Sequence, residues 1–176
     1  MQTAYRVLQQ HPQVLGSRIA MLGLSLSTSF TLKMAVYSQA IKPVEKAEML
    51  LLFVSEQVGQ LQCPLLLVVG EDDQNWPTYE SAMDMKEMME QAGNSHLLTV
   101  LSYPNAGHLI EPPYMPLSRA STFISVGSHK SVMALWGGET VAHSRAQEDA
   151  WRKTLVFLRE NLYGGMNPVA TLFCNL

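Results

Sequence analysis

The amino-acid sequence predicts an α/β fold in which helices cover a parallel β-sheet, and three observations support this prediction. Residues 64–70 contain an unbroken aliphatic run closed by glycine, which is typical of an interior parallel strand buried on both faces. A helical pattern over residues 78–91 and a strand pattern over residues 96–103 follow, so the order is strand, helix, strand. A shorter apolar run, residues 19–22, leads directly into another helical pattern.

The first half of the chain adds helices to this plan. Residues 4–10 have apolar positions at helical spacing until a proline stops them, so the chain opens on a helix. After the first strand, residues 28–37 are predicted to be helical, and a proline begins a second helical pattern over residues 43–61. Residues 49–54 are all apolar and could instead form a short strand, because periodicity alone cannot assign such a run.

The second half ends in a long helix. Residues 105–108 form a polar loop after the strand, and the proline-rich stretch that begins at residue 112 shows no regular pattern. Residues 140–162 then have a helical pattern. Because the carboxyl ends of parallel strands meet at one edge of a sheet, we expect a ligand to bind at that edge.

The composition favours one domain over residues 1–176 and argues against several functions. A net charge of −3 without a lysine or arginine cluster gives no signature of binding to nucleic acid or to a membrane surface. The two cysteines, Cys63 and Cys174, are too few for a disulfide framework and lack metal-ligand spacing, so we expect a reducing compartment and no metal. No apolar run is long enough to span a membrane or to act as a signal peptide.

The turn after the first strand contains the best candidate nucleophile. Residues 23–27 read Gly-Leu-Ser-Leu-Ser, close to the Gly-x-Ser-x-Gly pattern in which a sharp turn raises a serine hydroxyl above the sheet. The pattern makes Ser25 the candidate nucleophile. The alternative, that Ser25 only caps the following helix, stays open because a single such motif is weakly specific.

Three polar residues follow three successive strands in an order that suggests nucleophilic catalysis. They are Ser25, one of the pair Asp72 and Asp73, and His108. Their order is that of the α/β-hydrolase triad, in which a histidine takes the serine proton and a carboxylate orients the histidine. His96 and His143 are assigned structural roles, because neither lies at the end of a strand.

Four segments extend the argument to a known family. Residues 69–76, 102–114, 136–139 and 142–147 are similar to the C-terminal domain of the acyl-CoA thioesterase and bile acid-CoA:amino acid N-acyltransferase family. The resemblance covers nearly the whole chain. It implies an α/β-hydrolase fold, here an incomplete one, with Ser25 as nucleophile, Asp73 as acid and His108 as base, and it makes Asp72 a loop residue.

The resemblance also implies a reaction. Members that hydrolyse acyl-CoA mostly use serine, whereas the bile-acid conjugating members use cysteine, so Ser25 favours release of free fatty acid and coenzyme A. The substrate would be an acyl-CoA, with coenzyme A present only as part of it and no other cofactor. Transfer of the acyl group to glycine or taurine is the alternative. An ester intermediate on serine reacts less readily with amines than a thioester does, which lowers this alternative without excluding it.

The chain departs from the family pattern in several places. It lacks an N-terminal β-sandwich, the first strands of the sheet and a strand between Gln39 and Glu45, so we expect a fragment or a shortened isoform. An oxyanion hole needs two backbone N–H groups. The resemblance implies that this chain supplies only the N–H of Leu26, because the second would come from a loop that is missing here. Ser27 stands where the family has glycine, and Leu26 stands where it has lysine or serine.

These departures support a third hypothesis, a catalytically weak remnant of the family. Loss of strands would leave unpaired sheet edges beside residues 19–22, through which the chain would self-associate. The chain ends in Cys174-Asn175-Leu176, which lacks the basic residue of a peroxisomal signal, so the cytosol is the preferred location.

Overall fold

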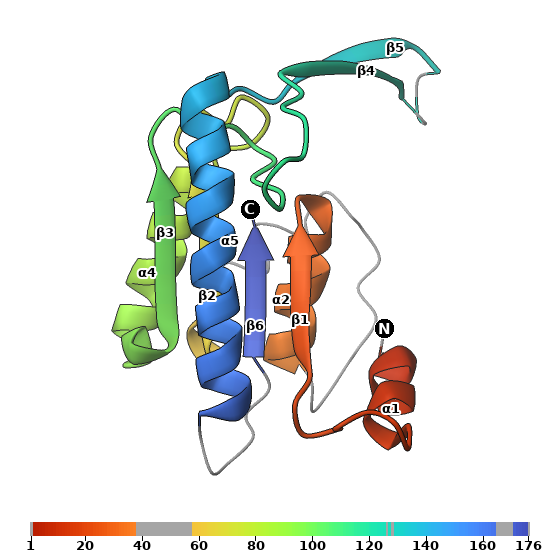
Figure 1. Ribbon diagram of the computed structural model, residues 1–176, viewed down its shortest axis with the longest axis vertical. Coiled ribbons are helices and arrows are strands. Elements are labelled where there is room, and N and C mark those ends of the chain that lie inside the picture. The colour runs from red at the N-terminus through yellow and green to blue at the C-terminus, as the bar shows by residue number, and fades with distance from the viewer. Residues whose placement is uncertain (1, 38–57, 126, 128, 165–170, 176) are drawn as a thin grey trace.

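A computed structural model describes residues 2–37, 58–125, 127, 129–164 and 171–175. These parts form a mixed α/β structure with a small parallel sheet flanked by helices (Figure 1). The helices are α1 (Gln2–Gln10), α2 (Leu26–Tyr37), α4 (Thr78–Gln91) and α5 (Thr140–Tyr163), with short 3₁₀ turns η2 (Val58–Gln60) and η3 (Ser95–Leu97). The strands are β1 (Ala20–Leu24), β2 (Leu65–Gly70), β3 (Leu98–Tyr103), β4 (Ala120–Ile124), β5 (Ser131–Leu135) and β6 (Thr171–Asn175).

The main sheet has four parallel strands in the order β1-β6-β2-β3. The helix α5 crosses one face of this sheet, and α2 and α4 lie behind the other (Figure 1). All six residues of β2 are buried, as the unbroken apolar run predicts.

Alternate side chains of β2 enter two hydrophobic clusters on opposite faces. One cluster contains Leu65, Leu67 and Val69 of β2 with Leu32 of α2 and Ala82, Met85 and Met89 of α4. The other contains Leu66 and Val68 of β2 with Ala106, Ile110, Ala146 and Ala150. Burial of both faces fixes β2 rigidly, and the loop that follows it therefore starts from a well-anchored point.

Most predicted elements are confirmed in the parts that the structure describes. The helix α4 has the predicted bounds, and α1, α2, α5, β1, β2 and β3 differ from the prediction only at their ends. The helix predicted over residues 43–61 lies mostly outside the described residues, where only the turn η2 is seen. The alternative strand over residues 49–54 also lies outside them.

The prediction of no regular structure after the prolines is wrong for part of that stretch. Strands β4 and β5 form an antiparallel hairpin that projects beyond the main sheet (Figure 1). All but one of their ten residues are exposed. Because neither face is buried, the pair carries no clear alternation of apolar and polar residues, and the pattern that identifies most strands is missing.

A third strand beyond the predicted ones, β6, changes the main sheet. Strand β6, from the C-terminal tail, lies between β1 and β2 and pairs in parallel with both. The expectation of an unpaired edge beside residues 19–22 is therefore wrong for the side of β1 that faces β2, but β1 is an end strand of the described sheet and its other side has no partner strand among the described residues. A five-residue strand whose partners lie far away in the sequence gives no local signal of its place in the sheet.

Candidate active site

Ser25 is the only residue between β1 and α2, and its backbone is in an uncommon conformation. Its φ angle is +54°, in the left-handed region that non-glycine residues rarely adopt. Gly23 permits the close turn, since a Cβ there would lie 2.7 Å from the Cα of Thr28 in the helix that follows. The sequence thus folds into a sharp strand-to-helix turn with the serine at its apex.

Ser27 braces this turn from the helix side. Its Oγ accepts a hydrogen bond from the N–H of Leu24 and donates one to the carbonyl of Leu24, both at 2.7 Å. The residue is exposed, so no helix packing is blocked where the resemblance expects glycine. This departure leaves the turn intact.

His108 lies in the loop after β3 and faces Ser25. The side chain of His108 is 1% exposed, and its Nε2 is 2.7 Å from the Oγ of Ser25. The backbone N–H of His108 donates to the carbonyl of Trp136 at 2.8 Å, and the two rings stack with centroids 5.4 Å apart. The imidazole is therefore held from its backbone and from one face.

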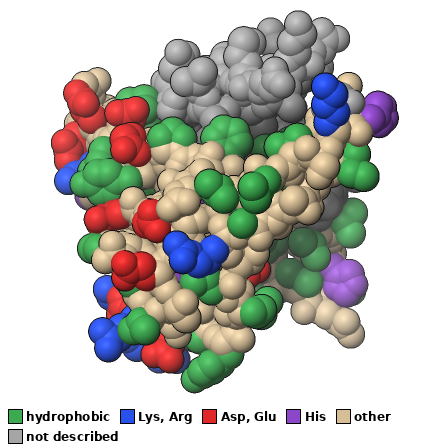
Figure 2. Space-filling view, turned by 90° about the horizontal axis from the view of Figure 1, so that it is seen from above, with side chains coloured by type: hydrophobic (Ala, Val, Ile, Leu, Met, Phe, Trp, Pro, Cys, Tyr) green, Lys and Arg blue, Asp and Glu red, His purple; other side chains and the backbone are tan. Residues whose placement is uncertain are grey.

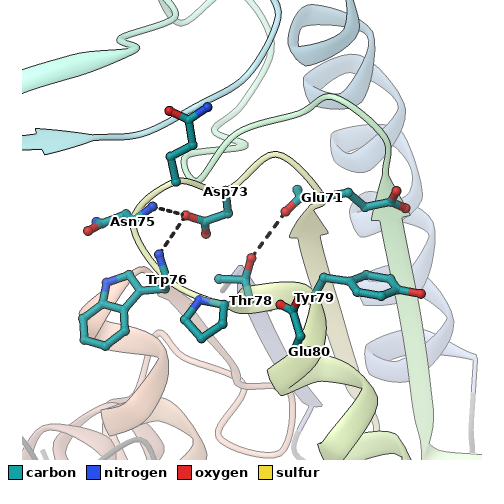
Figure 3. A pocket seen from close by; sticks show the side chains of 10 residues that line it. Glu71, Asp73, Asn75, Trp76, Thr78, Tyr79 and Glu80 are labelled. Carbon is teal, nitrogen blue, oxygen red and sulfur yellow. Dashed lines mark hydrogen bonds between the residues drawn. The ribbon is translucent and has the colours of Figure 1, made fainter.

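Asp73 lies in the loop after β2 and faces the other side of His108. Its Oδ2 is 2.7 Å from Nδ1 of His108, and its side chain is 3% exposed. Its Oδ1 accepts hydrogen bonds from the N–H groups of Asn75 at 2.8 Å and Trp76 at 3.0 Å (Figure 3). Burial opposes ionisation of Asp73, but these hydrogen bonds outweigh it and hold the pKa of the carboxyl below its ordinary value.

Asp72, the other member of the pair, points to a different part of the molecule. Its Oδ2 accepts a hydrogen bond from the N–H of Gly138 at 2.7 Å, and its Oδ1 accepts one from Gln74 at 3.1 Å. The structure thus brings Ser25, His108 and Asp73 together. Asp72 instead connects the loop after β2 to the loop before α5.

The hydrogen-bond pattern determines the tautomer of His108 that suits this arrangement. An ionised Asp73 can only accept, so Nδ1 of a neutral His108 carries the proton and Nε2 is free to accept one. The hydroxyl of Ser25 is then the donor to Nε2. A serine in this position can lose its proton to the histidine as it attacks an electrophilic carbon.

Leu26, the predicted oxyanion donor, is the first residue of α2. The N–H groups of the first helical turn have no partner within the helix, and the helix dipole favours negative charge at this end. Its backbone N–H is one residue beyond Ser25, where the residue after a nucleophile supplies a donor in this type of turn.

A cavity of about 380 Å³ lies beside the loop of Asp73 (Figure 3). Its lining includes the carboxylates of Glu71, Asp73 and Glu80, together with Trp76 and Tyr79. Neither Ser25 nor His108 lines it. Three acidic residues in the lining make the cavity unsuited to the phosphates of coenzyme A, and Asp73 is the one member of the candidate catalytic group that lines it.

Figure 2 views the molecule from the carboxyl ends of the strands. Acidic side chains gather at one side of this face, and lysine and arginine side chains are scattered over its coloured part.

Over the described residues no group of three His, Cys, Asp or Glu side chains could hold a metal ion. No helix in those same segments has both the length and the apolar character needed to cross a membrane.

Two residues hold the loop of His108: Trp136, which sequence reasoning missed, and His143, to which it gave a structural role without a place in the site. Trp136 contacts the ring and backbone of His108, and His143 contacts the residues on both sides of it. Both belong to segments that resemble the family, which was the only signal that could have singled them out. Their contacts depend on the packing of α5 and of the residue after β5 against the loop, and no local pattern encodes that packing.

Comparison with known proteins gives consistent results. The family described as "BAAT / Acyl-CoA thioester hydrolase C terminal" matches residues 1–46 and 43–164. Human acyl-coenzyme A thioesterase 6 is 28% identical over 201 aligned positions, which cover 88% of this chain and 47% of that protein. Human bile acid-CoA:amino acid N-acyltransferase is 37% identical over 79% of this chain and 28% of that protein. Mouse peroxisomal succinyl-coenzyme A thioesterase is 43% identical over 56% of this chain and 22% of that protein.

The chain spans less than half the length of these curated relatives. The alignment with the first of them has 201 positions, more than the 176 residues of the chain, so that relative contains residues without a counterpart here. The family match itself extends over most of the chain. The chain therefore belongs to the family of the C-terminal domains of bile acid-CoA:amino acid N-acyltransferase and the acyl-CoA thioester hydrolases.

Proposed function

We propose that this chain is an acyl-CoA thioester hydrolase with an incomplete α/β-hydrolase fold. One observation carries the proposal: the continuous hydrogen-bond chain from Ser25 through His108 to Asp73, with the serine at a strained turn. Such a group could act on many substrates. We infer acyl-CoA as the substrate because the relatives are named as thioesterases and an N-acyltransferase.

In the first half of the reaction, the Oγ of Ser25 attacks the thioester carbon while its proton passes to Nε2 of His108. The negative charge that develops on the carbonyl oxygen would be stabilised by the N–H of Leu26. Collapse of this intermediate breaks the C–S bond and releases coenzyme A, which takes the proton from His108. The acyl group remains on Ser25 as an ester.

In the second half, water attacks the ester and gives its proton to His108. Collapse releases the fatty acid and returns the proton to Ser25. Asp73 stays ionised throughout, orienting the imidazole and stabilising its positive charge. We propose no metal or redox cofactor, since the steps require only a nucleophile, a base and hydrogen-bond donors. The cytosol remains our inferred location.

The test is release of thiol from acyl-CoA, measured with DTNB. Ser25→Ala should lower the rate by about 10,000-fold or more, because it removes the attacking atom. Ser95→Ala is the matched control, since Ser95 is exposed in the turn η3, and it should leave the rate unchanged. Equal rates for the wild type and Ser25→Ala would reject the proposal.

Transfer to an amino acid is the second candidate, supported by the match to bile acid-CoA:amino acid N-acyltransferase. In that reaction glycine or taurine would replace water in the second half. Mass spectrometry of a reaction that contains acyl-CoA and either amino acid separates the two. An amide product would establish transfer, whereas thiol release without an amide would leave hydrolysis.

A further inference from the structure

His143 of α5 makes two hydrogen bonds that flank His108. Its side chain is buried, and its Nδ1 accepts the N–H of Gly107 at 3.1 Å. Its Nε2 is 2.8 Å from the carbonyl oxygen of Leu109. A single imidazole therefore binds the backbone immediately before and immediately after His108.

These partners allow only one state of His143. The N–H of Gly107 can only donate, so Nδ1 must carry no proton, and the carbonyl of Leu109 can only accept, so Nε2 must carry one. The ring is therefore neutral. Burial lowers the pKa of His143, and it outweighs the opposing effects of the Leu109 carbonyl and Glu111.

The segment that leads into α5 also docks against this loop. The N–H of Glu139 donates to the carbonyl of Asn105 at 2.8 Å, and Gly138 lies so close to His143 that a Cβ there would be 3.1 Å from Nδ1. Gly107 is confined too, since a Cβ on it would lie 2.5 Å from the carbonyl oxygen of Trp136. These contacts therefore restrict movement of the loop of His108 as long as α5 stays packed against it.

The position of this loop matters because His108 must satisfy two partners at once. Nδ1 and Nε2 are each 2.7 Å from an oxygen, one on Asp73 and one on Ser25, and these two residues lie in the turns that follow two different strands, β2 and β1. A shift of the loop would lengthen one or both contacts. Misplacement of a catalytic group by about 1 Å can cost about 100-fold in rate.

We propose that His143 is a positioning residue, which holds residues 107–109 so that His108 reaches both Asp73 and Ser25. This inference rests on the proposed hydrolase function. His143 would then affect the reaction without contacting the substrate. It would act through the backbone on either side of His108.

The kinetic test compares His143→Leu with His143→Gln. Leucine removes both hydrogen bonds, and we expect kcat for thioester hydrolysis to fall by about 10-fold to 100-fold with KM unchanged. Glutamine keeps one donor and one acceptor, so it should recover part of the loss. His96→Gln, at an exposed position, is the matched control and should behave as the wild type. A wild-type kcat in a folded His143→Leu protein would overturn the proposal.

A second readout needs no substrate. The proton shared between Nδ1 of His108 and Asp73 should give a downfield NMR resonance in the wild type, and this resonance should broaden or vanish in His143→Leu while the melt stays cooperative. An unchanged resonance would contradict a positioning role. If thiol release is insensitive to Ser25→Ala, the hydrolase proposal fails, and the resonance still reports on His143.

The wild type itself provides a check that does not depend on the folding of any variant. Long-range ¹H–¹⁵N spectra distinguish the two neutral tautomers of histidine and the imidazolium. We expect His143 at neutral pH to carry its proton on Nε2 alone. A proton on Nδ1 would exclude the hydrogen bond from Gly107 and would overturn the inference.

Discussion

The ring of His108 stacks on the ring of Trp136, with planes inclined by 28°, and the same tryptophan accepts the backbone N–H of His108. The indole N–H donates to the Oγ of Ser121 in β4 at 2.9 Å. Trp136 therefore links the base to the exposed hairpin. The hairpin is therefore connected to the site through Trp136, the residue that follows β5, although nearly all of its strand residues are exposed.

Trp136→Ala should weaken both folding and the site. Loss of the partly buried indole should lower the free energy of unfolding by about 1–3 kcal/mol, and loss of the stacked face should slow the reaction of Ser25. Trp136→Phe retains a stacked ring and should retain more of both properties. Thermal melts and thiol-release rates measure the two effects. Alanine and phenylalanine variants of equal activity would show that the ring does not orient His108.

The two aspartates should differ sharply in their effect on the rate. Asp73→Asn keeps the shape of the side chain but removes the charge that orients and stabilises His108, and it should lower kcat by about 10,000-fold. Asp72→Asn keeps an oxygen that can accept from Gly138, so it should change kcat little. The comparison uses thiol release by the two purified variants. Similar losses in both would contradict the assignment of Asp73.

His143 should make the stability of the fold depend on pH. Because the pKa of His143 is lowered in the folded protein, the unfolded chain takes up a proton at higher pH than the folded one. The free energy of unfolding should therefore fall as the pH drops below about 6.5, and this loss should end at the lower pKa of the folded state. Denaturant melts at about pH 8 and about pH 5 should differ more in the wild type than in His143→Gln. The same difference in both proteins would contradict this origin.

Strand β6 should be essential to the site as well as to the sheet. It separates β1, which carries Ser25 at its end, from β2, which leads to Asp73, so it sets the spacing of the two residues. Phe173→Pro removes a backbone donor from a strand paired on both sides, and the carbonyl left without its partner should lower the free energy of unfolding by about 1–3 kcal/mol.

The control is Thr122→Pro in the exposed hairpin, where β4 pairs with β5 alone. It should disturb the hairpin and lower the main melting temperature much less. Thermal melts and thiol-release rates compare the two variants. A Phe173→Pro protein that melts and reacts as the wild type would show that β6 does not separate β1 from β2.

The fold could be predicted from the sequence where the signal is local. The apolar run of β2 reflects burial of both of its faces, and the helical period of α4 reflects burial of one helix face against the sheet, so each pattern identifies its element. Strand β6 could not be placed, because its position depends on two partners from distant parts of the chain. The hairpin was missed because exposed strands do not alternate.

For the candidate site, the grouping of three residues could be predicted from the sequence, but the residues that support them could not. Ser25, Asp73 and His108 each follow a strand, so the geometry of a parallel sheet was enough to bring them to one edge. The choice of Asp73 over Asp72 came from the resemblance, and the structure places Asp73 on His108. The supports from Trp136 and His143 depend on tertiary packing, which a single sequence does not encode in any local pattern.

The central claim is that Ser25 is a nucleophile activated by His108, and active-site labelling with a fluorophosphonate tests it most directly. The purified chain should be labelled stoichiometrically on Ser25, identified by peptide mass spectrometry, and should show a cooperative melt. His108→Ala should abolish labelling, whereas His96→Gln should not. A cooperatively folded wild-type protein that takes up no probe, or takes it up equally in His108→Ala, would contradict the account and favour a catalytically weak remnant of the family.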